Sequence, residues 1–101
     1  MTDVVFIVSP YRGDIEQNEA FLAECFRDSI ARGECPVAGH AMYPRVLMDA
    51  DPEERALGVA LGHVLMACSD RVAVYAKLGV SDGMRLDVAE AGRLGLAVDW
   101  R

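Results

Sequence analysis

VVFIVSPYRG, residues 4–13, runs from five consecutive apolar residues, four of them β-branched, into a short polar segment that ends at Gly13. A continuous apolar run of this kind is typical of a central strand that is covered on both faces in a parallel sheet. Proline and glycine then interrupt the strand pattern. The stretch therefore predicts a strand over residues 3–9 whose carboxyl end leads into a polar loop.

Strand-like and helix-like segments alternate through the rest of the chain. Helical spacing of apolar residues predicts helices over residues 14–32, 51–68 and 81–94, and short apolar runs predict strands over residues 36–40, 71–75 and 96–100. This order predicts right-handed crossovers and a parallel sheet with helices on both faces. The expected fold is a single α/β domain, residues 1–101, with a three-layer, flavodoxin-like, doubly wound sheet of four strands in the order 2-1-3-4.

Each predicted helix has an apolar stripe that should face the sheet. The stripes consist of Phe21, Leu22, Cys25, Phe26, Ser29 and Ile30, then Leu57, Ala60, Leu61, Val64, Leu65 and Cys68, and finally Met84, Val88 and Ala91. Asp51 and Ser81 are expected to cap the second and third helices, with Pro52 at the first helical position.

Charge and cysteine content limit the partners, location and metal sites that the sequence allows. The formal net charge is -6, from 16 acidic and 10 basic residues, which disfavours a nucleic acid polymer or an anionic membrane as partner. The sequence has neither an apolar run long enough to cross a bilayer nor a basic segment ahead of its first apolar run, so we expect a cytoplasmic location. Cys25, Cys35 and Cys68 lack metal-ligand spacing, and we predict neither a metal nor a cofactor.

Three polar loops should meet at the carboxyl ends of the strands, where such sheets bind ligands. They are residues 9–13, 40–45 and 79–83. Ser9, Arg12 and Gly13 have the donors to hold an anion, and Asp87, one turn into the third helix, can reach the same place. Each residue also has a simpler interpretation. Arg12 can be a solvated turn residue, Asp87 a surface acid, His40 a hydrogen-bonded structural residue and Tyr43 a rim residue, while residues 53–55 can be a solvated helix start.

These motifs together resemble the nucleoside 2-deoxyribosyltransferase-like family, especially its short bacterial and phage-borne relatives of unknown function. The resemblance covers nearly the whole chain in order. It rests on the apolar strand with SPYRG, Asn18, His40 with Tyr43-Pro44, PEER (52–55) with Gly58, CSD (68–70), and Ser81-x-Gly83-Met84 with an acid at position 87.

Members of that family with known chemistry cleave or exchange the N-glycosidic bond of nucleosides or nucleotides. The resemblance implies catalytic roles for Asp87 and Tyr11, and a substrate-binding role for Ser9, Arg12, Gly13, His40, Tyr43, Ser81, Gly83 and Met84. Asp87 stands where the family has a glutamate, and Glu90 lies three residues further on. Where the transferases have a second acid, this chain has Leu61-Gly62-His63.

Several functions stay open on these grounds. Hydrolysis of the bond is favoured over transfer, and the alternative is a non-catalytic nucleotide-binding or sensing module, such as a phage or prophage accessory protein. A purely structural partner-binding domain is a third possibility. The small sheet leaves an edge strand and apolar helix surface to cover. We therefore expect a homodimer or higher oligomer, with Met42, Met48, Met66 and Trp100 as candidate contacts.

Overall fold

The computed structural model describes residues 2–101 and contains one four-stranded, all-parallel sheet. The strands are β1 (Val4–Val8), β2 (Cys35–Val37), β3 (Arg71–Val74) and β4 (Val98–Trp100), in the order β2-β1-β3-β4. Phe6 of β1 lies opposite Val37 of β2 and Val72 of β3, and Val74 lies opposite Trp100. The predicted fold class and strand order are confirmed.

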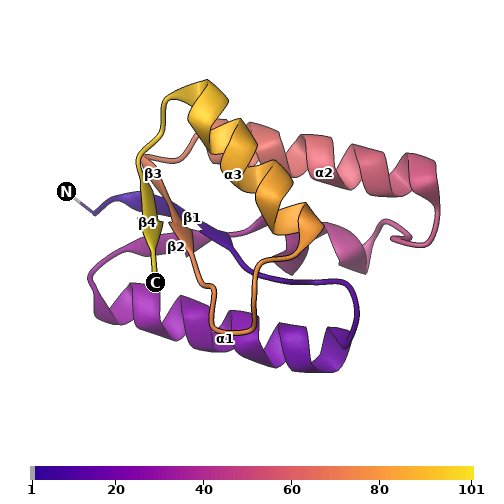
Figure 1. The fold of residues 1–101 in the computed structure, drawn as a ribbon, viewed down its shortest axis with the longest axis horizontal. Helices are drawn as coiled ribbons and strands as arrows, with labels where there is room; N and C mark the ends of the chain where they lie inside the picture. Colours follow the sequence, from indigo (N-terminus) through magenta and orange to yellow (C-terminus); the bar gives the residue numbers. More distant parts are fainter. Residues whose placement is uncertain (1) are drawn as a thin grey trace.

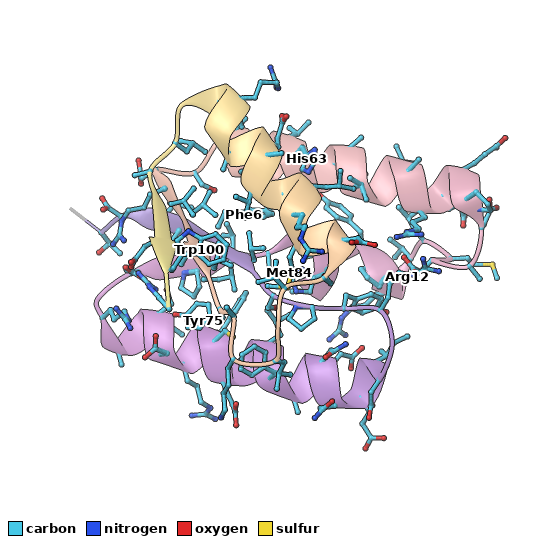
Figure 2. All side chains as sticks on the ribbon, viewed as in Figure 1. Phe6, Arg12, His63, Tyr75, Met84 and Trp100 are labelled. Carbon is cyan, nitrogen blue, oxygen red and sulfur yellow. The ribbon has the colours of Figure 1, made fainter. Side chains whose placement is uncertain are left out.

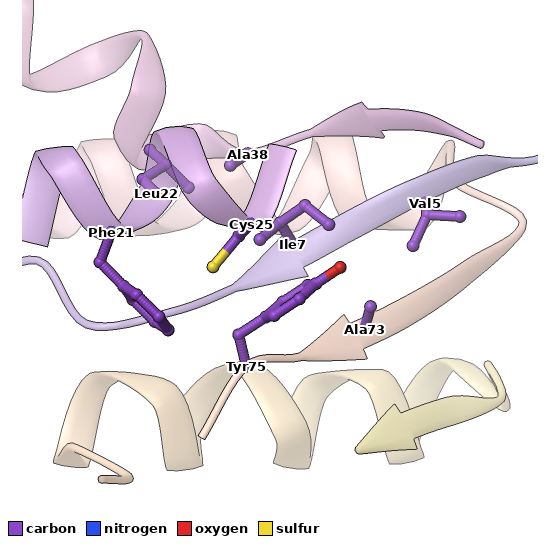
Figure 3. Packing of buried hydrophobic residues seen from close by; sticks show 8 residues of the cluster. All are labelled: Val5, Ile7, Phe21, Leu22, Cys25, Ala38, Ala73 and Tyr75. Carbon is purple, nitrogen blue, oxygen red and sulfur yellow. The ribbon is translucent and has the colours of Figure 1, made fainter. Parts of the chain in front are cut away.

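Three helices cover the sheet, with α1 (Ile15–Ala31) on one face and α2 (Pro52–Ala67) and α3 (Asp82–Leu94) on the other (Figure 1). Successive residues of a strand point to opposite faces. Val5 and Ile7 accordingly pack with Phe21, Leu22 and Cys25 on the α1 side (Figure 3), whereas Phe6 and Val8 pack with Met66, Met84 and Ala91 on the other side. The uninterrupted apolar run of β1 follows from burial on both faces.

The helix starts agree with the expected caps. The carboxylate of Asp51 accepts a hydrogen bond from the Glu53 amide at 3.0 Å, with Pro52 at the first helical position. Ser81 Oγ accepts one from the Met84 amide at 3.2 Å. Because these side chains satisfy amides that the helix leaves free, α2 and α3 begin where their sequences predict. No helix within residues 2–101 is both long and apolar enough to cross a membrane.

The predicted second strand, residues 36–40, is wrong at its carboxyl end. β2 stops at Val37, and two 3-10 turns follow, Gly39–Ala41 (η1) and Tyr43–Arg45 (η2), within what was expected to be strand and loop. The physical reason is a close approach of backbones. A Cβ atom on Gly39 would lie 3.0 Å from the Cα atom of Gly62 in α2, so the chain turns against α2 instead of continuing along the sheet.

The predicted apolar stripes are only partly correct. In α1, Ile30 is exposed. In α2, Leu57, Val64 and Cys68 are exposed, and Met66, expected at a contact between subunits, is fully buried in the core. Apolar residues surround most of the circumference of α2, so periodicity alone does not identify the buried side. Met42, Met48 and Trp100 are exposed, and self-association stays a prediction.

A buried ionic network joins the far end of the chain to the sheet. Arg101 donates two hydrogen bonds to the Glu34 carboxylate, at 2.7 and 2.8 Å, and one to Tyr75 Oη at 2.9 Å. Arg71 and Ser29 also donate to Glu34. The hydrogen bonds from Arg101, more than any other contact, lower the pKa of Glu34 to about 2. The network links α1, β3 and the segments flanking β2 and β4.

Candidate functional site

A cavity of about 370 Å³ opens at the carboxyl ends of the strands. Its lining comes from the segment after β1, the turns η1 and η2 with the segment that follows them, the first three turns of α2 and the first turns of α3. It includes every predicted site residue except Gly13: Ser9, Tyr11, Arg12, His40, Tyr43, Ser81, Gly83, Met84 and Asp87. Gly13 is exposed and has a φ of 102°, which turns the chain toward α1. This volume is in the range of small-molecule sites.

Asn18 shapes the segment that follows β1. Its side chain is buried, and Nδ2 donates to the carbonyl oxygens of Tyr11 and Arg12 at 2.9 and 3.0 Å. Two hydrogen bonds from one rigid helix hold consecutive residues of the loop in place. Asn18 thus sets the position of Tyr11 and Arg12 at the cavity without lining it.

Ser9, Tyr11 and His40 form a polar cluster on one wall. Ser9 Oγ and His40 Nε2 are 3.0 Å apart, and the rings of Tyr11 and His40 meet edge to face with centroids 6.2 Å apart. Burial lowers the pKa of His40 to about 4. Burial, with smaller effects of Glu19 and Asp49, raises the pKa of Tyr11. At neutral pH this wall therefore presents an uncharged imidazole and a protonated phenol.

Asp49 places a carboxylate beside the two arginines of the cavity. Its Oδ2 lies 2.9 Å from Arg12 Nε, and its Oδ1 lies 3.9 Å from Arg55 Nε. The sequence analysis did not predict these two ion pairs of Asp49. It assigned residues 53–55 to a solvated helix start, although Glu54 and Arg55 line the cavity. The position of Asp49 next to a helix cap was the available signal. Arg12 is already paired with the Asp49 carboxylate. Its predicted role in binding an anion therefore stays a prediction.

His63 of α2, labelled in Figure 2, contacts Asp87 of α3. Asp87 Oδ1 and His63 Nε2 are 2.9 Å apart. About a quarter of each side chain is exposed. Burial raises the pKa of Asp87, and the hydrogen bond from His63 opposes that rise. Glu90, the alternative acid, does not line the cavity, and its two oxygens accept hydrogen bonds from Arg93 at 2.7 and 2.6 Å.

Comparison with protein families finds a match over residues 3–101 to a family described as a domain of unknown function (DUF7768). The chain belongs to the DUF7768 family. No curated protein and no solved structure matches it. The resemblance to nucleoside 2-deoxyribosyltransferase-like proteins therefore stays a prediction.

The cavity of this DUF7768 domain combines acidic side chains with the uncharged polar wall of Ser9, Tyr11 and His40. Two arginines and four carboxylates line it, and Asp49 already contacts both arginines. Asp87 is a partly buried carboxylate whose pKa is raised by burial, and it is hydrogen-bonded to His63. A carboxylate in such a place can stabilise positive charge that develops on a bound substrate. Within residues 2–101, no cluster of three or more histidine, cysteine or acidic side chains is arranged to hold a metal ion.

Proposed function

We propose that this domain binds a nucleoside or nucleoside 5′-monophosphate and hydrolyses its N-glycosidic bond. The observation that carries the proposal is the partly buried carboxylate of Asp87 at a cavity of about 370 Å³. Cleavage of such a bond passes through an oxocarbenium-like transition state, which a carboxylate at contact distance stabilises. In the net reaction the bond from C1′ to the base breaks, water supplies a hydroxyl to C1′, and its remaining proton goes to the base.

The remaining lining residues suit recognition of a sugar and a base. Ser9 and neutral His40 offer hydrogen bonds to hydroxyl groups. The protonated phenol of Tyr11 can donate to an oxygen near the reacting carbon, and Tyr43 offers an aromatic face to the base. Ser81, Gly83 and Met84 line the cavity at the start of α3, where the positive end of the helix favours an anionic or polar group.

Release of free base is the direct test. Purified protein is incubated with a panel of nucleosides and their 5′-monophosphates, and chromatography measures the free base. Asp87→Asn should keep the fold and the binding of ligand but lose at least ~10²-fold in turnover, the scale of removing one preorganised electrostatic group. Glu90→Gln is the matched control, because Glu90 belongs to the same helix but contacts Arg93. Loss of activity in Glu90→Gln and not in Asp87→Asn would refute the residue assignment.

One observation favours a non-catalytic alternative. Asp87 Oδ1 is already engaged by His63, and the side chain of aspartate is one methylene shorter than that of the glutamate that the resemblance implies. Under this alternative the domain binds a nucleotide without turnover and acts as a sensing or sequestering module. Saturable binding in calorimetry, with no base released from any bound compound, would select it and exclude the enzyme.

A further inference from the structure

Asp87 lies between the cavity and His63. Asp87 lines the cavity, and His63 contacts Asp87 but does not line it. An ionised carboxylate only accepts hydrogen bonds, so Nε2 of His63 is the donor whether the imidazole is neutral or charged. Within residues 2–101, Asp87 Oδ2 has no hydrogen-bond partner. The contact thus occupies one oxygen and leaves the other for a ligand.

We infer that His63 is a positioning residue, which fixes the Asp87 carboxylate across the α2–α3 interface through its hydrogen bond. The inference rests on the proposed function for its catalytic consequence, but its structural content is independent of that function. A carboxylate held in one orientation, with one oxygen facing the cavity, complements the charge of a cationic transition state without having to reorient.

The charged groups around the pair leave His63 as the direct partner of Asp87. Glu90 is close enough to His63 to interact with its charge and is itself held by Arg93. The other titratable groups at the cavity are Arg12, His40, Asp49, Glu54, Arg55 and Asp82, with the phenols of Tyr11 and Tyr43. Among the charged side chains of residues 2–101, only that of His63 affects the pKa of Asp87, and it opposes the rise caused by burial.

Two substitutions test the hydrogen bond itself. In His63→Gln, the amide nitrogen can replace Nε2 as a donor to Asp87. In His63→Leu, the donor is absent. Turnover of a cleaved nucleoside should fall about 10- to 100-fold in His63→Leu, the range that a hydrogen bond to a charged group spans, and His63→Gln should recover most of it.

A second readout does not depend on activity. The carboxyl carbon of Asp87, followed by ¹³C NMR against pH, should titrate at higher pH in His63→Leu than in wild type, because burial then acts without a donor. Circular dichroism checks that both variants fold, and His63→Gln gives the result if His63→Leu does not. An Asp87 titration that is the same in wild type and in both variants would overturn the inference. If wild type cleaves no nucleoside but the titration shifts as expected, the proposed function fails and the positioning role stands.

Discussion

Asp49 determines, at the scale of a single residue, which charges the cavity offers to a ligand. Its carboxylate contacts Arg12, the residue predicted to hold a phosphate, closely and Arg55 more distantly. Both arginines are partly exposed, and exposed ion pairs contribute only about 0–1 kcal/mol. A ligand phosphate therefore competes with Asp49 for the same donors, and an uncharged nucleoside does not.

Asp49→Asn should raise the affinity for a nucleoside 5′-monophosphate relative to the parent nucleoside by roughly 3- to 10-fold, because it releases both arginines. Isothermal titration calorimetry with both ligands measures the ratio. Asp82→Asn removes the same charge at the cavity but acts on a fully exposed carboxylate that pairs with Arg85. An equal change in the two variants would mean that net charge, and not release of the arginines, sets the preference.

The contact between η1 and α2 is the decisive feature at the scale of elements. Gly39 and Gly62 let the two backbones approach, and this approach brings His40 to the cavity beside Ser9. A Cβ atom at position 39 would lie at ordinary contact distance from the Tyr43 ring but only 3.0 Å from the Gly62 Cα atom. Because that tight contact is with backbone, the turn or the helix would have to give by a few tenths of an ångström. The geometry of the Ser9–His40 wall therefore depends on two glycines that contribute no functional group.

Gly39→Ala should reduce the free energy of unfolding by about 1–3 kcal/mol, the usual cost of inserting a methyl group where no space exists. Urea denaturation followed by circular dichroism measures it. Gly92→Ala is the control, since a Cβ there has nothing within 4 Å and lies within a helix. That variant should be stabilised by about 0.5–1 kcal/mol. If Gly39→Ala is as stable as wild type, η1 is free to move away from α2.

At the scale of the whole molecule, we expect the Glu34 network to contribute to acid stability, because it connects segments that are far apart in the chain. The folded pKa of Glu34 is about 2, below the ordinary glutamate value of 4.5. A depressed carboxyl pKa contributes stability that is present above the unfolded value and is lost as pH falls through the folded one. Stability should therefore decline between about pH 4.5 and pH 2.

Glu34→Gln should flatten that decline and destabilise the protein at pH 7 by about 3–5 kcal/mol, because the buried Arg101 loses its buried counter-charge and keeps only that of the exposed Asp99. Chemical denaturation at a series of pH values measures both effects. Asp3→Asn is the control, since Asp3 pairs with Arg71 at a more exposed position and should cost less than 1 kcal/mol. An unchanged pH dependence in Glu34→Gln would show that other carboxyls control acid unfolding.

Exposed apolar side chains on the α2–α3 layer carry the prediction of self-association. Val64, Leu57 and Leu86 are all exposed there, and apolar surface of this kind favours association. We expect a homodimer in light scattering at micromolar concentration, and Val64→Glu should shift it to monomer. Ile30→Glu, at an exposed site on α1, should leave the dimer intact. A wild-type protein that is monomeric under these conditions contradicts the expectation.

Local signals predicted the parts of the molecule that depend on local physics. The apolar run of β1 indicated burial on both faces, and Asp51-Pro52 and Ser81 marked the starts of α2 and α3. The alternation of strands and helices predicted the parallel sheet, and the order expected for a doubly wound sheet of four strands is the order observed. These features depend on backbone hydrogen bonding and on the spacing of apolar residues. Both can be read from a short stretch of sequence.

The tertiary structure alone decided which side of α2 is buried and which residues face one another. Val64 is exposed and Met66 is buried, with Gly62 turned toward Gly39. Because apolar residues surround most of α2, their spacing does not predict which side of the helix faces the sheet. The pairing of His63 with Asp87 likewise joins residues on different helices. The sequence by itself determined the fold and the edge of the sheet where the cavity lies. The charges and hydrogen bonds within that cavity came from contacts between elements distant in the chain, which only packing brings together.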